Sequence, residues 1–254
     1  GTIAATGRLP LDGDRAQLVV AAQPRGIDLA AAERAFPFAK GPFGGRADAS
    51  IRLAGQRFTL ASSEVRTLGG VITASGQALL GKVPSYDMNV AVRALDLEAA
   101  RKAFGVARVP FVGVAGATMH VAGAGTRFRA NGPIQVVGRA IVPDERGAPT
   151  KRFMPVRVAG TVGVSPRSVD LNPMEIRIGA SHVTARGRVA LDGASDLRLD
   201  GQVADAPAIA RVFALPPVQG GDATLQARAI GPAGALRFDA KLALERTVVA
   251  GNRL

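Results

Sequence analysis

Three aspartates stand at a fixed distance from a phenylalanine, and they are the first residues in this chain whose pattern could carry chemistry. Each Phe follows its Asp by eight residues. Carboxylates that recur at matched positions are candidates for general acid–base catalysis. The three pairs are Asp28 and Phe36, Asp96 and Phe104, and Asp205 and Phe213.

The stretch between each Asp and its Phe predicts a structural role for these residues instead. The first two stretches are rich in Ala, Glu and Arg, and the third carries Pro207 where a first helical turn would lie. Asp is a favoured helix N-cap, and proline is tolerated in the first turn. The sequence therefore predicts three short helices, each capped by its Asp and held against a sheet by its Phe.

The three helices belong to a longer phrase that the chain repeats. An Ala-x-Gly-x segment precedes each Asp, and a glycine follows each Phe before a new extended segment begins. The segments are Ala5–Arg8, Ala74–Gln77 and Ala185–Arg188, and the glycines are Gly45, Gly113 and Gly221. A recurring phrase is typical of repeat architectures. We expect a single elongated repeat domain over residues 1–254, with approximate repeat units 1–68, 69–180 and 181–254, and with extra hairpins around 126–170.

Between the predicted helices, apolar and polar residues alternate with a period of two. Residues 175–178, 182–191, 196–200 and 236–244 show this most clearly. The alternation is typical of antiparallel strands with one apolar and one wet face, so the predicted fold class is all-β with short helices. The candidates for the apolar face are Ile176, Ile178, Val183, Val189, Leu191, Leu197, Leu199, Leu236, Phe238 and Leu242.

Turn signals separate the alternating runs and predict hairpins. Among them are Ser165-Pro166, Asp192-Gly193 and Asn131-Gly-Pro133. The longest irregular stretch, 143–152, predicts an exposed polar loop between strands at 136–142 and 153–164.

Several classes of protein are excluded by composition. Of the 254 residues, 47% are hydrophobic, so the chain can bury a large core and is not disordered by composition. There is no cysteine, which excludes disulfides and thiolate metal sites. No run approaches the ~18 consecutive apolar residues of a membrane-spanning helix.

His120 and His182 occupy positions expected to be exposed, without convergent ligands. No nucleophile elbow or phosphate-binding glycine motif is present, so we predict no enzymatic activity, metal or cofactor.

The charge balance is strongly basic, at +12 from 32 Lys and Arg against 20 Asp and Glu. Such a balance could attract an anionic surface, such as phospholipid headgroups, lipopolysaccharide or nucleic acid. The basic residues are scattered, however, which favours ordinary solvated strand faces. Aromatic residues make up only 4% of the chain, and stacking aromatics beside the basic residues are lacking. Nucleic acid is therefore not a predicted partner.

The order of strand, Asp, Ala-rich helix, Phe, glycine turn and strand resembles the AsmA-like and TamB-like repeat proteins of Gram-negative envelopes. These are similar in design to eukaryotic bridge-like lipid transfer proteins. The resemblance is clearest in residues 26–55, 94–125 and 203–231, and the strands between them extend it over the whole chain. The third copy departs from the pattern, because Ala206 replaces the Leu after Asp and Ile209 replaces an Ala.

The resemblance implies a curled antiparallel sheet with a taco-like cross-section and an apolar inner groove, which the candidate residues above would line. Members are anchored in the inner membrane, extend across the periplasm and are implicated in moving phospholipid to the outer membrane. Some are linked instead to the assembly of outer-membrane proteins. The family offers no catalytic residue. This chain, which begins at Gly1 and has no anchor helix, would be an internal segment of such a protein.

The function expected from these observations is non-enzymatic transport of phospholipid acyl chains. Exposing a chain of about 16 carbons to water costs on the order of 13 kcal/mol at ~0.8 kcal/mol per CH₂, and an apolar groove removes most of that cost. The same apolar faces could instead pack on each other in a closed sandwich or barrel. Two other functions stay open: a periplasmic scaffold that engages outer-membrane proteins through strand edges, and a secreted β-solenoid that binds a polyanionic glycan through its arginines.

Overall fold

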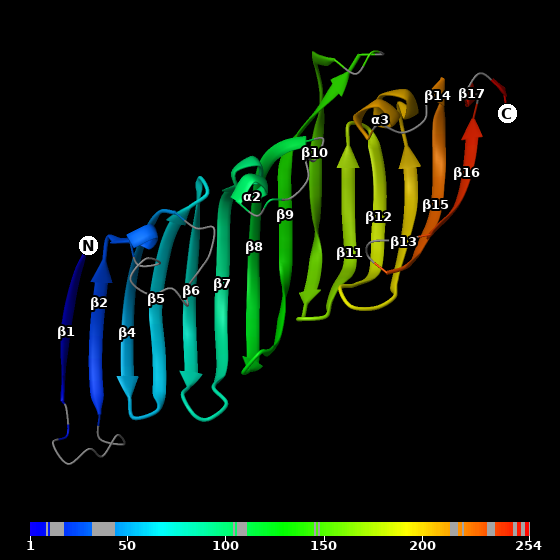
Figure 1. Ribbon diagram of the computed structural model, residues 1–254. Coiled ribbons are helices and arrows are strands. Elements are labelled where there is room, and N and C mark those ends of the chain that lie inside the picture. Colours follow the sequence, from blue (N-terminus) through cyan, green and yellow to red (C-terminus); the bar gives the residue numbers. More distant parts are fainter. Residues whose placement is uncertain are drawn as a thin grey trace. The chain divides into compact units, whose positions relative to one another are not determined.

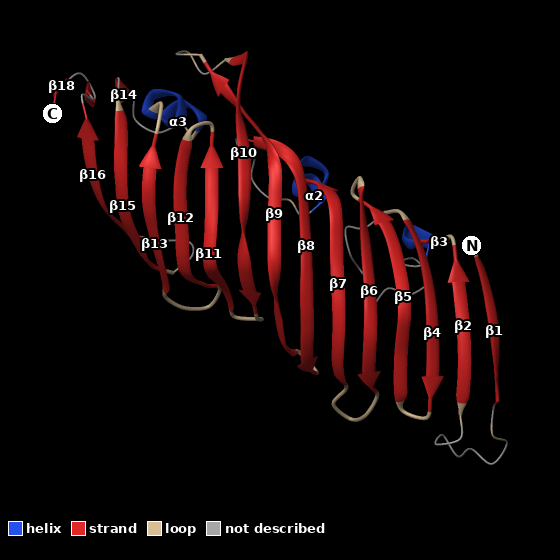
Figure 2. Ribbon diagram, turned by 180° about the vertical axis from the view of Figure 1, so that it is seen from behind, coloured by secondary structure: helices blue, strands red, loops and turns tan. Residues whose placement is uncertain are grey.

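The chain folds into one long antiparallel sheet that is not closed, accompanied by a few short helices (Figures 1 and 2). The computed structural model describes residues 1–254 except 9, 11–17, 32–43, 104, 106–110, 145, 147, 214–217, 220, 233–236, 246–247, 250–251 and 254. The strands follow each other in the order β1-β2-β4-β5-β6-β7-β8-β9-β10-β11-β12-β13-β15-β16, and β3 pairs with β4. A separate small sheet has the order β14-β17-β18. The prediction of an all-β fold with short helices is confirmed, and the sheet is not a closed barrel.

The chain divides into two compact units. Unit 1 comprises residues 1–107 and 115–132, and unit 2 comprises residues 108–114 and 133–254. The elements up to β7 are β1 (Thr2–Arg8), β2 (Val19–Arg25), β3 (Ile27–Asp28), β4 (Arg46–Ala54), β5 (Arg57–Thr67), β6 (Gly70–Leu79) and β7 (Ser85–Asp96), followed by helix α2 (Leu97–Ala103). Residues of β8 (Phe111–Ala124) and β9 (Arg127–Pro143) belong to both units. Unit 2 continues with β10 (Pro149–Val164), β11 (Ser168–Ile178), β12 (Ser181–Ala190), β13 (Ser195–Val203), α3 (Ala206–Val212), β14 (Val218–Gln219), β15 (Asp222–Gly231), β16 (Arg237–Glu245), β17 (Val248–Val249) and β18 (Asn252–Arg253).

The three recurring aspartates are helix caps, as predicted. In each case one carboxylate oxygen accepts a hydrogen bond from the backbone N–H three residues later, which satisfies a donor that the first helical turn leaves free. The bonds are Ala31 N to Asp28 Oδ1 at 3.0 Å, Ala99 N to Asp96 Oδ1 at 2.8 Å, and Ala208 N to Asp205 Oδ1 at 3.3 Å. The catalytic interpretation of these carboxylates is therefore unnecessary.

Of the three phenylalanines of the phrase, the structure describes Phe213, and this residue does not anchor its helix. Phe36 and Phe104 lie outside the described residues. Phe213 is the C-cap of α3, where its N–H donates to the carbonyl of Ile209, and the residue stays 41% exposed. Other residues of α3 anchor it, because Ala208 and Val212 are buried in the core cluster of unit 2 and Ile209 packs against that cluster. The prediction for Phe213 was wrong because the helix already ends there.

Helix α2 carries its own charge pairing. Glu98 in the first turn lies 2.8 Å from Arg101 and 3.6 Å from Lys102 in the last turn. The hydrogen bond from Arg101 lowers the pKa of Glu98 to about 2. A depressed carboxyl pKa means that the pairing favours the folded helix above the unfolded pKa and is lost as the pH falls toward 2.

The glycines of the Ala-x-Gly-x segments are required by the backbone of neighbouring strands. Gly76 in β6 and Gly187 in β12 have φ of +148° and +125°, and a Cβ on either would lie 2.2 Å or 2.1 Å from a carbonyl oxygen of the next strand. On the other side, each glycine pairs with a residue at the edge of a β-bulge, Leu60 in β5 and Leu171 in β11. The repeated phrase therefore marks matching bulge-and-glycine pairs in the two units.

Two predictions about connections need correction. Asn131-Gly-Pro133 was expected to be a turn, but it lies inside β9. Its glycine serves strand packing, because a Cβ on Gly132 would lie only 1.9 Å from the carbonyl oxygen of Thr118 in β8. The loop predicted over 143–152 is shorter, because β9 continues to Pro143 and β10 begins at Pro149.

We expect Asp205→Ala to destabilise unit 2 by about 1–2 kcal/mol, because α3 loses its cap. Asp205 also has a left-handed backbone, with φ 52° and ψ 52°, which alanine tolerates poorly and asparagine tolerates well. Asp205→Asn keeps a capping oxygen and loses only the exposed ion pair with Arg152. Urea unfolding of both variants checks the prediction, and equal losses in the two would contradict it.

Candidate functional site

Strands β10 to β15 of unit 2 share an apolar face. Directly paired residues of neighbouring strands point to the same side of a sheet, so the register aligns apolar side chains in rows across the strands. One row is Val158, Ile176, Val183, Gly201 and Leu225; the next is Gly160, Met174, Ala185, Leu199 and Ala227; a third is Val162, Leu171, Gly187, Leu197 and Ala229. We call these three rows the apolar face.

The opposite face of the same strands carries the charges. Its ion pairs join neighbouring strands at 3.2 Å for Arg186 and Asp200, 2.6 Å for Arg188 and Asp170, and 2.7 Å for Arg228 and Asp196. The hydrogen bond from Arg228 lowers the pKa of Asp196. The two sides of the sheet therefore differ in polarity.

Most of the predicted groove residues meet on this side of the sheet. Ile176, Val183, Leu197 and Leu199 belong to the rows, and all four remain partly exposed. Val189 pairs with Val169, which extends the same side toward the turn after β12. Ile178 is only 9% exposed, because it belongs to the core cluster under α3.

The remaining four candidates are not among the residues of the three rows. Leu191 lies in the turn after β12 and is 61% exposed, so it is not part of the strand face. Leu236 lies outside the described residues. Phe238 and Leu242 of β16 pair with Ala229 and Leu225 of β15 in the backbone register.

Helix α3 covers only one end of this side of the sheet. The buried cluster beneath it consists of Ala140, Val142, Met154, Val156, Ile178, Ala208 and Val212. Two buried serines on the same side are internally satisfied, since Ser195 Oγ accepts from Ala190 N at 3.0 Å and Ser181 Oγ bonds to the backbone of Ala204. The apolar face therefore offers aliphatic contact and little hydrogen bonding.

Unit 1 has an apolar face of its own, which was not among the predicted site residues. Its rows include Val20, Leu53, Phe58 and Ala78; Ile51, Leu60 and Met88; and Ala47, Val65, Ile72 and Val92. All are partly exposed. The same period-two alternation could have identified them, but the bulge in β5 shifts the pattern by one residue between Leu60 and Ser63.

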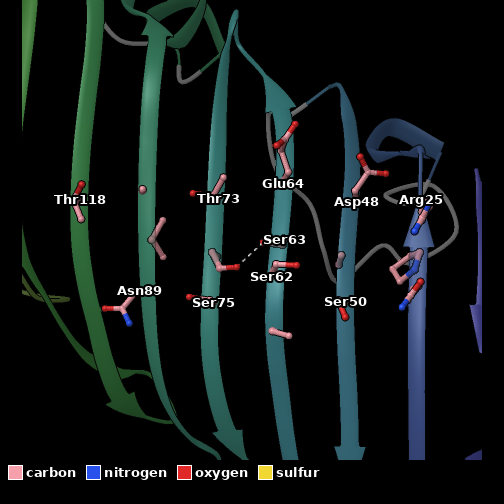
Figure 3. A pocket seen from close by; sticks show the side chains of 17 residues that line it. Arg25, Asp48, Ser50, Ser62, Ser63, Glu64, Thr73, Ser75, Asn89 and Thr118 are labelled. Carbon is pink, nitrogen blue, oxygen red and sulfur yellow. Dashed lines mark hydrogen bonds between the residues drawn. The ribbon is translucent and has the colours of Figure 1, made fainter.

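The polar side of unit 1 contains a hollow of about 760 Å³ (Figure 3). The bulge in β5 bends the strand here, and the labelled side chains come from β2, β4, β5, β6, β7 and β8. Two of its charged groups already have partners, since Asp48 accepts from Gly26 N at 2.6 Å and Glu64 pairs with Arg66 at 2.8 Å. Arg25 is the third charged residue of the lining. The uncharged polar lining consists of Gln23, Ser50, Ser62, Ser63, Thr73, Ser75, Asn89 and Thr118. Alanine, valine and proline side chains line the hollow as well, so its surface is of mixed polarity.

The described part of the chain brings one histidine close to a carboxylate. His120 lies 2.9 Å from Asp87, but both side chains are more than half exposed, and His182 is exposed as predicted. No group of three or more His, Cys, Asp or Glu that could hold a metal ion is found in this part of the chain. Nor is any of its helices long and apolar enough to cross a membrane.

Comparisons of the chain with protein-family models, with curated proteins and with solved structures find no match. The resemblance to the AsmA-like and TamB-like proteins therefore stays a prediction that rests on the repeated phrase.

Proposed function

We propose that this chain is a segment of a lipid-transfer bridge that carries phospholipid acyl chains along the apolar face. The observation that supports this most is the register of β10 to β15, which aligns aliphatic side chains in three rows and leaves several of them partly exposed. A sheet normally buries such a face against a second layer. In the described part of unit 2, α3 covers one end of that side only.

The chemistry of the apolar face suits a hydrocarbon chain that must move. Its side chains are Val, Leu, Ile, Met and Ala, which offer nondirectional contacts to a hydrocarbon. Hydrophobic contact depends on area and not on direction, so an acyl chain can shift along the rows without breaking specific bonds. At ~0.8 kcal/mol per CH₂, covering most of a chain of about 16 carbons offsets on the order of 10 kcal/mol of exposure to water.

The resemblance supplies the cellular setting of the proposal. It suggests a periplasmic segment of a protein that is anchored in the inner membrane through parts outside this chain and passes phospholipid toward the outer membrane. No enzymatic step, cofactor or metal is part of the proposed function.

Lipid uptake by the delipidated protein tests the proposal. The protein should bind a fluorescent phospholipid added below its aggregation threshold, and native mass spectrometry should show the lipid-bound mass. A protein that retains its β-sheet circular dichroism and takes up no lipid would rule the proposal out.

A second candidate function is supported by the exposed edge strand β1. All seven of its residues are exposed, Ile3 to 68%, and within the described residues β1 pairs with β2 alone. An edge of this kind can accept another strand, which favours the scaffold for outer-membrane proteins. Capture of a β-hairpin peptide that is lost in a Thr6→Pro variant would support this alternative, because proline removes a backbone donor from the edge.

A further inference from the structure

An exposed apolar cluster lies on the otherwise polar side of unit 2, at strands β8 to β10. Four large apolar side chains form it, and we call it the outer patch. They are Val112 at 37%, Val114 at 43%, Val137 at 48% and Phe153 at 52% exposure. Contiguous exposed apolar side chains on a folded domain commonly mark an interaction surface.

The strand geometry places these side chains together. A Cβ on Gly113 would lie 2.4 Å from the carbonyl oxygen of Val137 and 2.6 Å from the Cα of Gly138, so the two glycines face each other across β8 and β9. Their neighbours in sequence therefore point to the same side. Arg139 connects this pair of strands to β10, because its guanidinium carbon lies 4.9 Å from the ring centre of Phe153.

The opposite side of the same strands is already occupied. Ala140, Val142, Met154 and Val156 are buried in the cluster with α3. These strands thus carry large apolar side chains on both sides, in contrast to β12, whose outer side carries Arg186 and Arg188 without a large apolar residue. Core packing explains the inward residues, but it does not explain the outward ones.

Basic side chains surround the outer patch. Lys151 and Arg157 alternate with Phe153 along β10 and are exposed on the same side, and Arg139 stacks on the ring. Arg157 is paired in the sheet with Arg177, whose charge is already matched by Glu175 at 3.6 Å. Lys151, Arg139 and Arg157 therefore leave an excess of positive charge around an apolar centre.

We propose that the outer patch docks on the surface of an anionic phospholipid bilayer. An apolar centre with an aromatic ring enters the boundary between headgroups and acyl chains, and adjacent cations are attracted to anionic headgroups. This site faces away from the apolar face, so it goes beyond the proposed function and does not depend on it. It would hold the segment against a membrane while the apolar face on the other side of the sheet binds single lipids.

Vesicle flotation with a tryptophan probe tests this proposal. The chain has no tryptophan, so Phe153→Trp introduces a single reporter at the centre of the patch, and Ile230→Trp introduces one at a residue of unit 2 that is 42% exposed. With phosphatidylcholine vesicles that contain phosphatidylglycerol, the emission of Trp at 153 should shift to shorter wavelength, and that of Trp at 230 should not. Vesicles of phosphatidylcholine alone should bind much more weakly.

A triple variant separates the patch from general electrostatic attraction. Val114→Ser, Val137→Ser and Phe153→Ser together should weaken vesicle binding at least about tenfold, because the buried apolar area is lost. Ile230→Ser is the matched control and should bind as the unchanged protein does. If the triple variant still binds the vesicles, the positive charges alone account for binding and the proposal is overturned. The proposal is also overturned if the unchanged protein does not bind anionic vesicles, or if Trp at 153 is shielded by a protein partner and not by vesicles. The triple variant should still take up single lipids as the unchanged protein does. Lipid uptake and vesicle binding therefore test the proposed function and the docking proposal separately.

Discussion

Replacing Leu199 with aspartate should abolish lipid uptake and leave the sheet folded. Leu199 stands in the middle row of the apolar face and is partly exposed, so the carboxylate can reach water in the lipid-free protein. When an acyl chain lies along the row, the same carboxylate loses water without gaining a partner, which costs several kcal/mol. We expect uptake of fluorescent phospholipid to fall by at least about a hundredfold, since every ~1.4 kcal/mol is tenfold in affinity.

The matched control for this variant lies on the same strand. Gln202 is exposed on the opposite side of β13, so Gln202→Asp introduces the same charge without touching the apolar face. Val189→Asp should repeat the loss at a second position on the apolar side. Thermal unfolding followed by circular dichroism establishes that the variants are folded. Equal uptake by Leu199→Asp and Gln202→Asp would contradict the account.

Gly187→Ala should strongly destabilise unit 2. Its φ of +125° is a backbone conformation that side chains disfavour, which costs about 1–3 kcal/mol. The added Cβ would also lie 2.1 Å from the carbonyl oxygen of Asp196, and backbone atoms of a paired strand cannot easily move away. We expect the free energy of unfolding to drop by at least about 2 kcal/mol.

Gly193 provides the comparison for this change. It lies in the turn after β12, and a Cβ there would meet only the Cβ of Ala190 at 3.8 Å, an ordinary contact. Gly193→Ala should therefore change stability by well under ~1 kcal/mol in urea unfolding. If the two substitutions cost the same, the glycine of the repeated phrase is not required by its backbone conformation or by the close approach of β13.

Within strands that contain no bulge, alternation was sufficient to predict which residues share a side of the sheet. Val183, Leu197 and Leu199 lie on one face because side-chain direction in any extended strand has a period of two, so the positions in the sequence are enough to assign the side. The helix caps were predictable for a similar reason, since Asp96 and Asp205 act on N–H groups only three residues away. Local interactions of this kind need no knowledge of the rest of the fold.

The features that sequence reasoning missed depend on contacts between strands. Gly132 looked like a turn residue, but it lies in a strand, where the lack of a side chain allows the backbone of β8 to approach closely. Phe213 looked like an anchor because large apolar residues usually are, yet α3 packs through Ala208 and Val212. The outer patch was invisible because Val112, Val137 and Phe153 lie far apart in sequence, and only the register brings them together.

Photo-crosslinking of a lipid to chosen positions tests the central claim most directly. A photoreactive amino acid placed at Val183 or Leu199 lies on the apolar face, whereas one placed at His182 or Gln202 lies on the opposite side of the same strands. After incubation with phospholipid and illumination, mass spectrometry should find lipid adducts at Val183 and Leu199 and few at His182 or Gln202. Adducts of equal yield on the two sides, or adducts confined to the polar side, would contradict the proposal that acyl chains travel along the apolar face.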